Sequence, residues 1–252
     1  MPAKFARGAC DILWPVKILS APIDSPPSTR PALKQVEHRT LREQVTSGVR
    51  TALMNGYFQP GQTITVKSIS SLLGTSVMPA REAMNRLIAE GALELRANRS
   101  VIVPVLSRQE FNELAELRAD VEGRAAAQAA AHVDASQIAQ LLALNKVMRD
   151  AVRSRDVAAF LDANYKFHFL IYRLGATRFV LTIIEQLWVR VGPLIRLSLD
   201  ESGFADAGRM HSDVIKGLRA HDDQAAGEAV REDILGAAVR IRSVNDAAGS
   251  WH

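Results

Sequence analysis

The feature that most constrains this fold is a run of three short helical segments between residues 41 and 91, each followed by a glycine. In the first of them Leu41, Val45 and Val49 recur at the spacing of one helix face, which predicts an amphipathic helix. The expected segments are 41–55, about 67–73 and about 76–91. A tight turn separates the last two, so the sequence predicts a helix-turn-helix.

After the third helix the pattern changes from helical to extended. Residues 92–95 and 101–103 are mostly apolar, and the polar stretch 96–100 between them is typical of a turn. We expect a two-stranded hairpin here, which would form the wing of a winged helix-turn-helix domain spanning 36–106.

The remainder of the chain shows only helical periodicity. Ser107 and Glu110 have the spacing of a capping box, which opens a long helix and sets a domain boundary just before it. Further helices are expected at about 134–153, 156–174, 177–199, 205–220 and 223–244, with a kink at Gly192-Pro193. The predicted fold class is therefore mainly α: a winged helix-turn-helix, then an all-α bundle over 107–245 that binds an effector and dimerises. Proline-rich residues 1–35 are predicted to be a mobile tail, and 246–252 a second tail.

Charge is unevenly distributed. Residues 1–106 carry 13 Lys and Arg against 7 Asp and Glu, whereas residues 107–252 carry 18 against 20. A basic segment joined to a mildly acidic one fits a nucleic-acid reader with a companion domain, although ordinary charge scatter gives the same totals. The single Cys10 excludes an internal disulfide, and no apolar run of eighteen residues occurs. We expect a cytoplasmic protein without a membrane segment.

The third helix of a helix-turn-helix enters the major groove, so its exposed polar residues are the candidates for base contacts. Arg81 is the leading candidate, because arginine can pair bidentately with guanine. Ser76 and Arg86 are placed to contact phosphates. Additional backbone contacts are expected from Lys67, Arg96 and Arg99. The alternative is that Arg81 and Glu82 form only a solvated helix face.

Four polar side chains share the apolar faces of the bundle helices: Asn164, His168, His211 and Asp233. They could converge as nitrogen and oxygen ligands of a divalent metal such as zinc, nickel or manganese. The alternative is a hydrogen bond between His211 and Asp233 without any metal. Asp162 lies about 120° from His168 around its helix and is excluded as a ligand.

Arg118 falls in phase with the apolar residues of the first bundle helix, where an unpaired guanidinium would be costly. Its partner is either Glu122 one turn on or the carboxylate of a bound ligand. Arg190 and Arg196, which flank the Gly192-Pro193 step, are further candidates for binding an acidic effector.

Several motifs in order resemble the GntR family of bacterial regulators. They are Phe58-Gln-Pro-Gly61, the run from Leu72 to Ala83, and Arg86-Leu-Ile-Ala-Glu-Gly91. Gly91-Ala-Leu-Glu and Asn98-Arg-Ser-Val101 are similar to the wing of the vanillate-regulator-like branch. Val77 stands where family members usually have arginine, and Ala80 replaces a larger aliphatic residue.

The resemblance implies a FadR-type effector domain, named FCD, in the second half of the chain. Many such domains bind a divalent metal through an aspartate and three histidines. Asn164, His168, His211 and Asp233 occupy the four slots, so an asparagine replaces the aspartate and an aspartate the last histidine. The arginine slot beside the pocket, which meets organic-acid effectors in the family, is Arg118.

These observations favour a homodimeric transcriptional regulator, with repression as the expected mode. It would bind a near-palindromic operator in double-stranded DNA and respond to a small carboxylate effector. The alternative is a metal-dependent enzyme in the bundle with an appended DNA-binding module. No general base or nucleophile is evident beside the candidate ligands, so we expect no enzyme activity. A protein that binds only other proteins would leave Arg81 and the wing unused.

Overall fold

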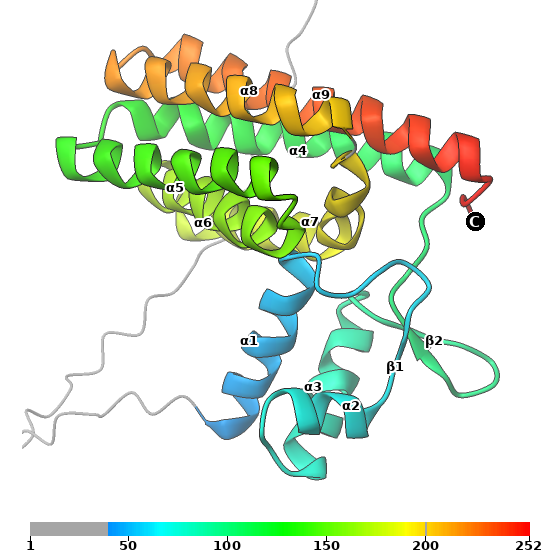
Figure 1. Ribbon diagram of the computed structural model, residues 1–252. Helices are drawn as coiled ribbons and strands as arrows, with labels where there is room; N and C mark the ends of the chain where they lie inside the picture. The colour runs from blue at the N-terminus through cyan, green and yellow to red at the C-terminus, as the bar shows by residue number, and fades with distance from the viewer. Residues whose placement is uncertain (1–39, 200) are drawn as a thin grey trace, which may run out of the picture. The chain divides into compact units, whose positions relative to one another are not determined.

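The computed structural model describes residues 40–199 and 201–252, with only the backbone described for 201–208 (Figure 1). The predicted mobile tail, residues 1–35, lies outside the described residues. The described part is mainly α-helical, as the sequence predicted, with one small sheet.

The winged helix-turn-helix forms as expected. Its elements are α1 (Leu41–Met54), β1 (Thr63–Ile64), α2 (Val66–Leu72), α3 (Val77–Ala89), β2 (Glu94–Leu95) and β3 (Val101–Ile102). Threonines begin the first two helices: Thr40 and Thr65 each accept a hydrogen bond from the backbone three residues on. Val49, Leu53 and Leu87 are completely buried where α1 packs against α3. We call residues 40–103 the reader.

The sheet has one strand more than predicted. β1 pairs antiparallel with β3, which in turn pairs antiparallel with β2, in the order β1-β3-β2. No strand was predicted at Thr63 and Ile64, because a strand of two residues shows no periodicity of its own. The predicted wing hairpin is confirmed, and β1 extends it toward α2.

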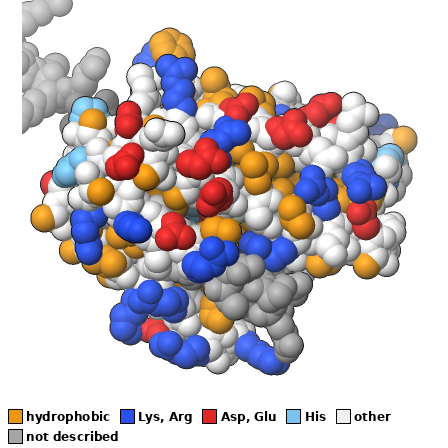
Figure 2. All heavy atoms as spheres, turned by 90° about the horizontal axis from the view of Figure 1, so that it is seen from above, with side chains coloured by type: hydrophobic (Ala, Val, Ile, Leu, Met, Phe, Trp, Pro, Cys, Tyr) orange, Lys and Arg blue, Asp and Glu red, His pale blue; other side chains and the backbone are white. Residues whose placement is uncertain are grey.

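The bundle consists of α4 (Arg108–Ala130), α5 (Ala135–Ser154), α6 (Val157–Gly175), α7 (Arg178–Ile195), the 3-10 turn η1 (Arg196–Ser198), α8 (Glu201–Arg219) and α9 (Asp223–Ala248). The predicted capping box is confirmed, since Ser107 and Glu110 exchange hydrogen bonds at the start of α4. α4 packs against α6 and α9, and α8 packs against α9 and α5 (Figure 1). Seen from above, this part carries acidic and basic side chains intermixed with hydrophobic ones (Figure 2).

The C-terminal residues differ from the expected tail over 246–252. α9 continues to Ala248, and Gly249 ends it in the left-handed conformation (φ 58°). Trp251 then lies against Phe111, with ring centroids 5.4 Å apart, and its indole N–H donates to Asp246. The chain end therefore returns to the start of α4.

α7 contacts α1 through backbone atoms. A Cβ on Gly192 would lie 2.7 Å from Met54 Cα and would also overlap the Leu53 carbonyl oxygen. Gly56, which has φ 63°, faces the same point, since a Cβ there would be 2.9 Å from the Gly192 carbonyl oxygen. Only glycine permits this close approach between the reader and the bundle. Pro193 lies inside α7, which continues past it to Ile195.

Gly192→Ala is expected to destabilise the protein by about 1–3 kcal/mol, because the added methyl group must push α1 away from α7. Gly236→Ala in α9 is the matched control: its Cβ would meet nothing closer than 3.8 Å, so the substitution should be neutral or stabilising by up to about 1 kcal/mol. Urea unfolding curves of the two variants test this. Equal midpoints would show that the glycine contact contributes nothing.

Candidate functional site

The four predicted ligand residues converge in the bundle. Asn164 and His168 come from α6, His211 from α8 and Asp233 from α9, and all four are buried and line one cavity of about 40 Å³. Ligand atoms of the two histidines and the aspartate all lie within 4.8 Å of one another. Residues separated by up to 69 positions in the chain are thus brought together in one small site.

The contacts within this cluster leave His211 unsatisfied. His168 Nε2 lies 3.3 Å from Asp233 Oδ2, whereas His211 Nε2 is 3.8 Å from Asp233 Oδ1. Neither ring nitrogen of His211 has a hydrogen-bond partner among the described residues. The alternative of a direct His211–Asp233 hydrogen bond is therefore not realised. Buried polar atoms without partners are costly, and a histidine with a free lone pair beside a carboxylate fits a metal ligand.

Burial and charge shift the pKa values of this cluster in the direction that ligand binding needs. Burial lowers the pKa of His211 to about 4, although Asp233 opposes the shift. Burial alone would raise the pKa of Asp233, but the nearby His211, His168 and Arg118 outweigh this effect and bring the value to about 2. At neutral pH His211 is thus uncharged and Asp233 is a carboxylate, which are the forms that bind a metal.

A second group of polar residues, Tyr172, Trp188 and Glu122, is linked to His168 through its Nδ1 atom. Of these residues, sequence reasoning identified only Glu122. Tyr172 donates its hydroxyl proton to Glu122 Oε2 at 2.5 Å, and Trp188 Nε1 donates to the same oxygen at 2.9 Å. Burial raises the pKa of Tyr172 well above its ordinary value, so the phenol keeps this proton. The Tyr172 oxygen then accepts from His168 Nδ1 at 3.0 Å. This arrangement leaves His168 Nε2 facing the cavity.

Arg118 pairs with Glu122, the first of its two predicted partners. Its Nε and Nη2 donate to the two oxygens of Glu122 at 2.7 and 3.2 Å, which is the ion pair expected one turn on. Its guanidinium also lies 5.1 Å from the centre of the Trp188 ring and lines the cavity that holds the candidate ligands. The pair therefore neutralises the buried charge while keeping Arg118 at the cavity wall.

The other two candidate arginines lie elsewhere. Arg190 donates to the carbonyl oxygens of Gln186 and Glu90 at 2.8 and 3.1 Å, so it joins α7 to the end of α3. Arg196 is exposed and lines a different pocket. Neither lines the cavity of the candidate ligands. Asp162, excluded by helical phase, indeed pairs with Lys166 on the surface.

The residues predicted to contact DNA from the two helices are all exposed. Ser76 is the N-cap of α3 and makes no side-chain capping bond, which leaves its hydroxyl available. Arg81 lies on α3 and Lys67 on α2. Arg86 is already engaged by Glu90, with Nε 2.9 Å from Oε1.

The wing places the remaining two arginines at its turn. Arg96 lies 3.4 Å from Glu94, and its backbone N–H bonds to the Ser100 carbonyl. Arg99 is exposed and takes the left-handed conformation, with φ 64°. Asn98 stabilises this turn by accepting from the Ser100 amide and hydroxyl. No DNA contact was predicted from the sequence for the exposed apolar pair that begins α3, Val77 and Met78, which are 50% and 63% exposed.

Two family profiles match consecutive parts of the chain. Residues 41–103 match the bacterial regulatory proteins of the gntR family, and residues 113–235 match the FCD domain. The HTH-type transcriptional regulator McbR of Escherichia coli (strain K12) is 29% identical over 163 residues, covering 65% of this chain and 74% of that protein. The HTH-type transcriptional repressor RspR of the same strain is 22% identical over 212 residues, covering 84% and 93%.

The solved structure of E. coli McbR/YncC has the same fold, with a TM-score of 0.75 at 23% identity, over 84% of this chain and 100% of that one. In the described part of the chain no helix combines the length and the apolar character that crossing a membrane requires. The reader, the FCD bundle and the named relatives agree on one class of protein. This chain is a DNA-binding transcriptional regulator that belongs to the GntR family and carries an FCD domain.

Proposed function

We propose that this regulator is a homodimeric repressor whose affinity for a near-palindromic operator changes when a small carboxylate binds at a metal in the bundle. The observation that carries this proposal is the convergence of His168, His211 and Asp233 in a buried cavity, with both ring nitrogens of His211 lacking a partner among the described residues. A sensor needs such a binding site, and the reader would respond to its occupancy with a change in DNA affinity.

For DNA, we assign base readout to Arg81 and backbone contacts to residues around it. Arg81 is exposed on α3, and no described residue pairs with it, so its guanidinium is available for guanine. The Ser76 hydroxyl and Lys67 suit phosphates, as do Arg96 and Arg99 of the wing. Arg86 would contribute after exchanging Glu90 for phosphate. Val77 and Met78 offer apolar contact with thymine methyl groups.

For the metal, the donor set fits a small divalent ion such as zinc, nickel or manganese. His168, His211 and Asp233 would supply two nitrogens and one oxygen, with the Asn164 amide oxygen lining the same cavity. When bound, the ion would supply a positive charge to which a carboxylate can bind. The hydroxyl of Tyr172 fixes the orientation of the His168 ring by accepting from Nδ1.

The cavity is too small to hold the proposed effector without a change in its wall. About 40 Å³ holds a few water molecules, which is less than the body of an organic acid needs. Arg118 stands at the wall to meet a carboxylate. The acid must therefore displace another part of the wall. Ile195 at the end of α7, Ser198 of η1 and Leu199 after it are the lining residues that do not lie in the middle of a long helix.

Displacement of that segment would also change the position of the reader. The end of α7 leads directly back to Gly192, where the helix touches α1 through backbone atoms. The Arg190 bond to the Glu90 carbonyl adds a second link, to the end of α3. A ligand that favours one position of α7 therefore favours one position of α3, the helix that would enter the major groove. In this way an effector would alter the affinity for the operator.

The proposed function is tested by selecting sites from a random DNA library with the purified protein, with and without a panel of small organic acids. We expect an enriched inverted repeat whose affinity changes with one of the acids. Absence of any enriched sequence at physiological salt would overturn the operator proposal. An enriched repeat that no acid affects would overturn the effector proposal alone.

Arg81→Ala should weaken binding to the selected operator by about 5- to 150-fold, which corresponds to losing about 1–3 kcal/mol of base discrimination. Binding to unrelated DNA should change much less. Arg149→Ala, which removes an exposed arginine from α5 in the bundle, is the control and should bind both DNAs as the wild type does. Equal losses on both DNAs for Arg81→Ala would assign it to the phosphate backbone.

Tyr172→Phe should weaken zinc binding about 10- to 100-fold, because the His168 ring loses the hydroxyl that orients it. Competition with a chromophoric chelator measures the affinity. His168→Ala should abolish stoichiometric binding, and His132→Ala, at an exposed position, should leave it unchanged. Wild-type affinity in His168→Ala would remove the cluster as the metal site.

Metal-free protein should lose stability as the pH falls from 6.5 toward 4. The folded state holds the pKa of His211 at about 4, whereas the unfolded chain takes up this proton near the ordinary value of 6.5. The stabilisation is therefore complete above pH 6.5 and declines by up to about 3 kcal/mol below it. Urea unfolding at several pH values measures the slope.

His211→Gln removes this titrating group and should flatten the curve between pH 6.5 and 4 relative to the wild type. His132→Gln, at an exposed site, should retain the wild-type slope. An unchanged slope in His211→Gln would show that the pKa of His211 is the same in the folded and unfolded states.

A further inference from the structure

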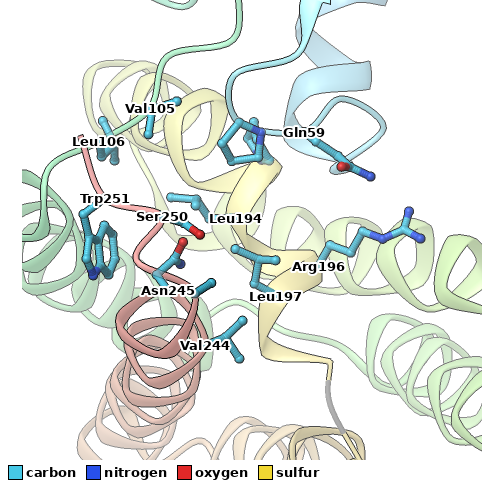
Figure 3. Close-up of a pocket in the computed structure, with 13 residues that line it drawn as sticks. Gln59, Val105, Leu106, Leu194, Arg196, Leu197, Val244, Asn245, Ser250 and Trp251 are labelled. Carbon is cyan, nitrogen blue, oxygen red and sulfur yellow. The ribbon is translucent and has the colours of Figure 1, made fainter.

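A second pocket, separate from the metal cavity, lies where the reader, the linker after it and the bundle meet (Figure 3). Its volume is about 370 Å³, within the range of pockets that hold small molecules. Gln59 and Pro60 of the reader contribute to it, as does Val105 of the linker. The bundle contributes the end of α7, η1 and the end of α9 with the residues after it. We call this pocket the junction pocket.

The walls of the junction pocket differ in polarity from one side to the other. In Figure 3 Trp251 and Leu106 lie at one side, and Leu194 and Leu197 lie between them and the opposite side. The polar ends of Gln59 and Arg196 both lie at that opposite side. Trp251 is held in place by Phe111 and by its bond to Asp246, so the apolar side is preformed.

Arg196 gives the polar side a positive charge. Within the described part of the chain no carboxylate forms an ion pair with Arg196, and the side chain is exposed. Guanidinium groups bind carboxylates through paired hydrogen bonds, and an apolar wall beside them excludes fully hydrophilic anions. We infer that the junction pocket binds an amphipathic monocarboxylate, with its carboxylate on Arg196 and Gln59 and its hydrocarbon part toward Trp251.

The same short segment separates this pocket from the metal cavity. Ile195, Ser198 and Leu199 line the metal cavity, whereas Arg196 and Leu197 line the junction pocket. A ligand in the junction pocket therefore touches η1 from the side opposite to the proposed effector. It also touches the reader at Gln59. The junction pocket is thus a second regulatory site, which acts on the reader directly and on the metal cavity through η1.

The test uses octanoate as the probe, titrated calorimetrically into the full-length protein. The whole octanoate ion has about ten non-hydrogen atoms, which suits a pocket at the lower end of the small-molecule range. We expect saturable binding of octanoate, and none of acetate, which lacks the chain, or octylammonium, which lacks the acid. Arg196→Glu should weaken octanoate binding at least about tenfold. Ala248→Trp, which fills the pocket from the end of α9, should abolish it.

Arg178→Glu is the matched control, because it makes the same charge change at an exposed position near the other end of α7. It should bind octanoate as the wild type does, and so should His168→Ala, which removes only the metal site. No saturable binding up to about 1 mM, or equal affinity in Arg196→Glu and wild type, would overturn the proposal. Loss of binding in His168→Ala would instead place octanoate in the metal cavity, and would also overturn it.

Discussion

The bundle depends on one buried carboxylate, that of Glu122. It receives hydrogen bonds from Arg118 on its own helix, from Tyr172 on α6 and from Trp188 on α7, and its side chain is completely buried. An isolated charge at this depth would be prohibitively costly, so each donor is needed to stabilise it. These hydrogen bonds in turn fix the orientations of the donors. Because Tyr172 also accepts from His168 Nδ1, the orientation of the His168 ring is fixed as well. The candidate metal cavity therefore depends on an ion pair whose arginine lines its wall.

Much of the secondary structure and part of the candidate site could be predicted from the sequence, because these features depend on residues close together in the chain. The Ser107 capping box, the helical periods and the wing hairpin each follow from residues close together in the chain. Helical phase also identified Asn164, His168, His211 and Asp233, because a polar residue on an apolar face must be buried. Tyr172 could have been found in the same way, since it lies one turn beyond His168.

Other features depend on contacts that no local pattern encodes. Trp188 and Glu122 meet across 66 residues, and an indole on an apolar face looks like ordinary core. Arg190 and Arg196 were grouped by their closeness to the Gly192-Pro193 step, yet one joins the reader and the other lines a separate pocket. The two glycines at the contact of α1 and α7 were read as a helix end and a kink. Their shared role is visible only when both backbones are in place.

The short strand β1 has a consequence for how the reader meets its target. Because β3 lies between β1 and β2, the inner strand of the wing is hydrogen-bonded to the segment that enters α2. The backbone of the wing is thereby joined to the start of the helix that carries Lys67. The backbone contribution to the entropy lost on association is thereby reduced, so more of the electrostatic attraction to the phosphates is retained as affinity.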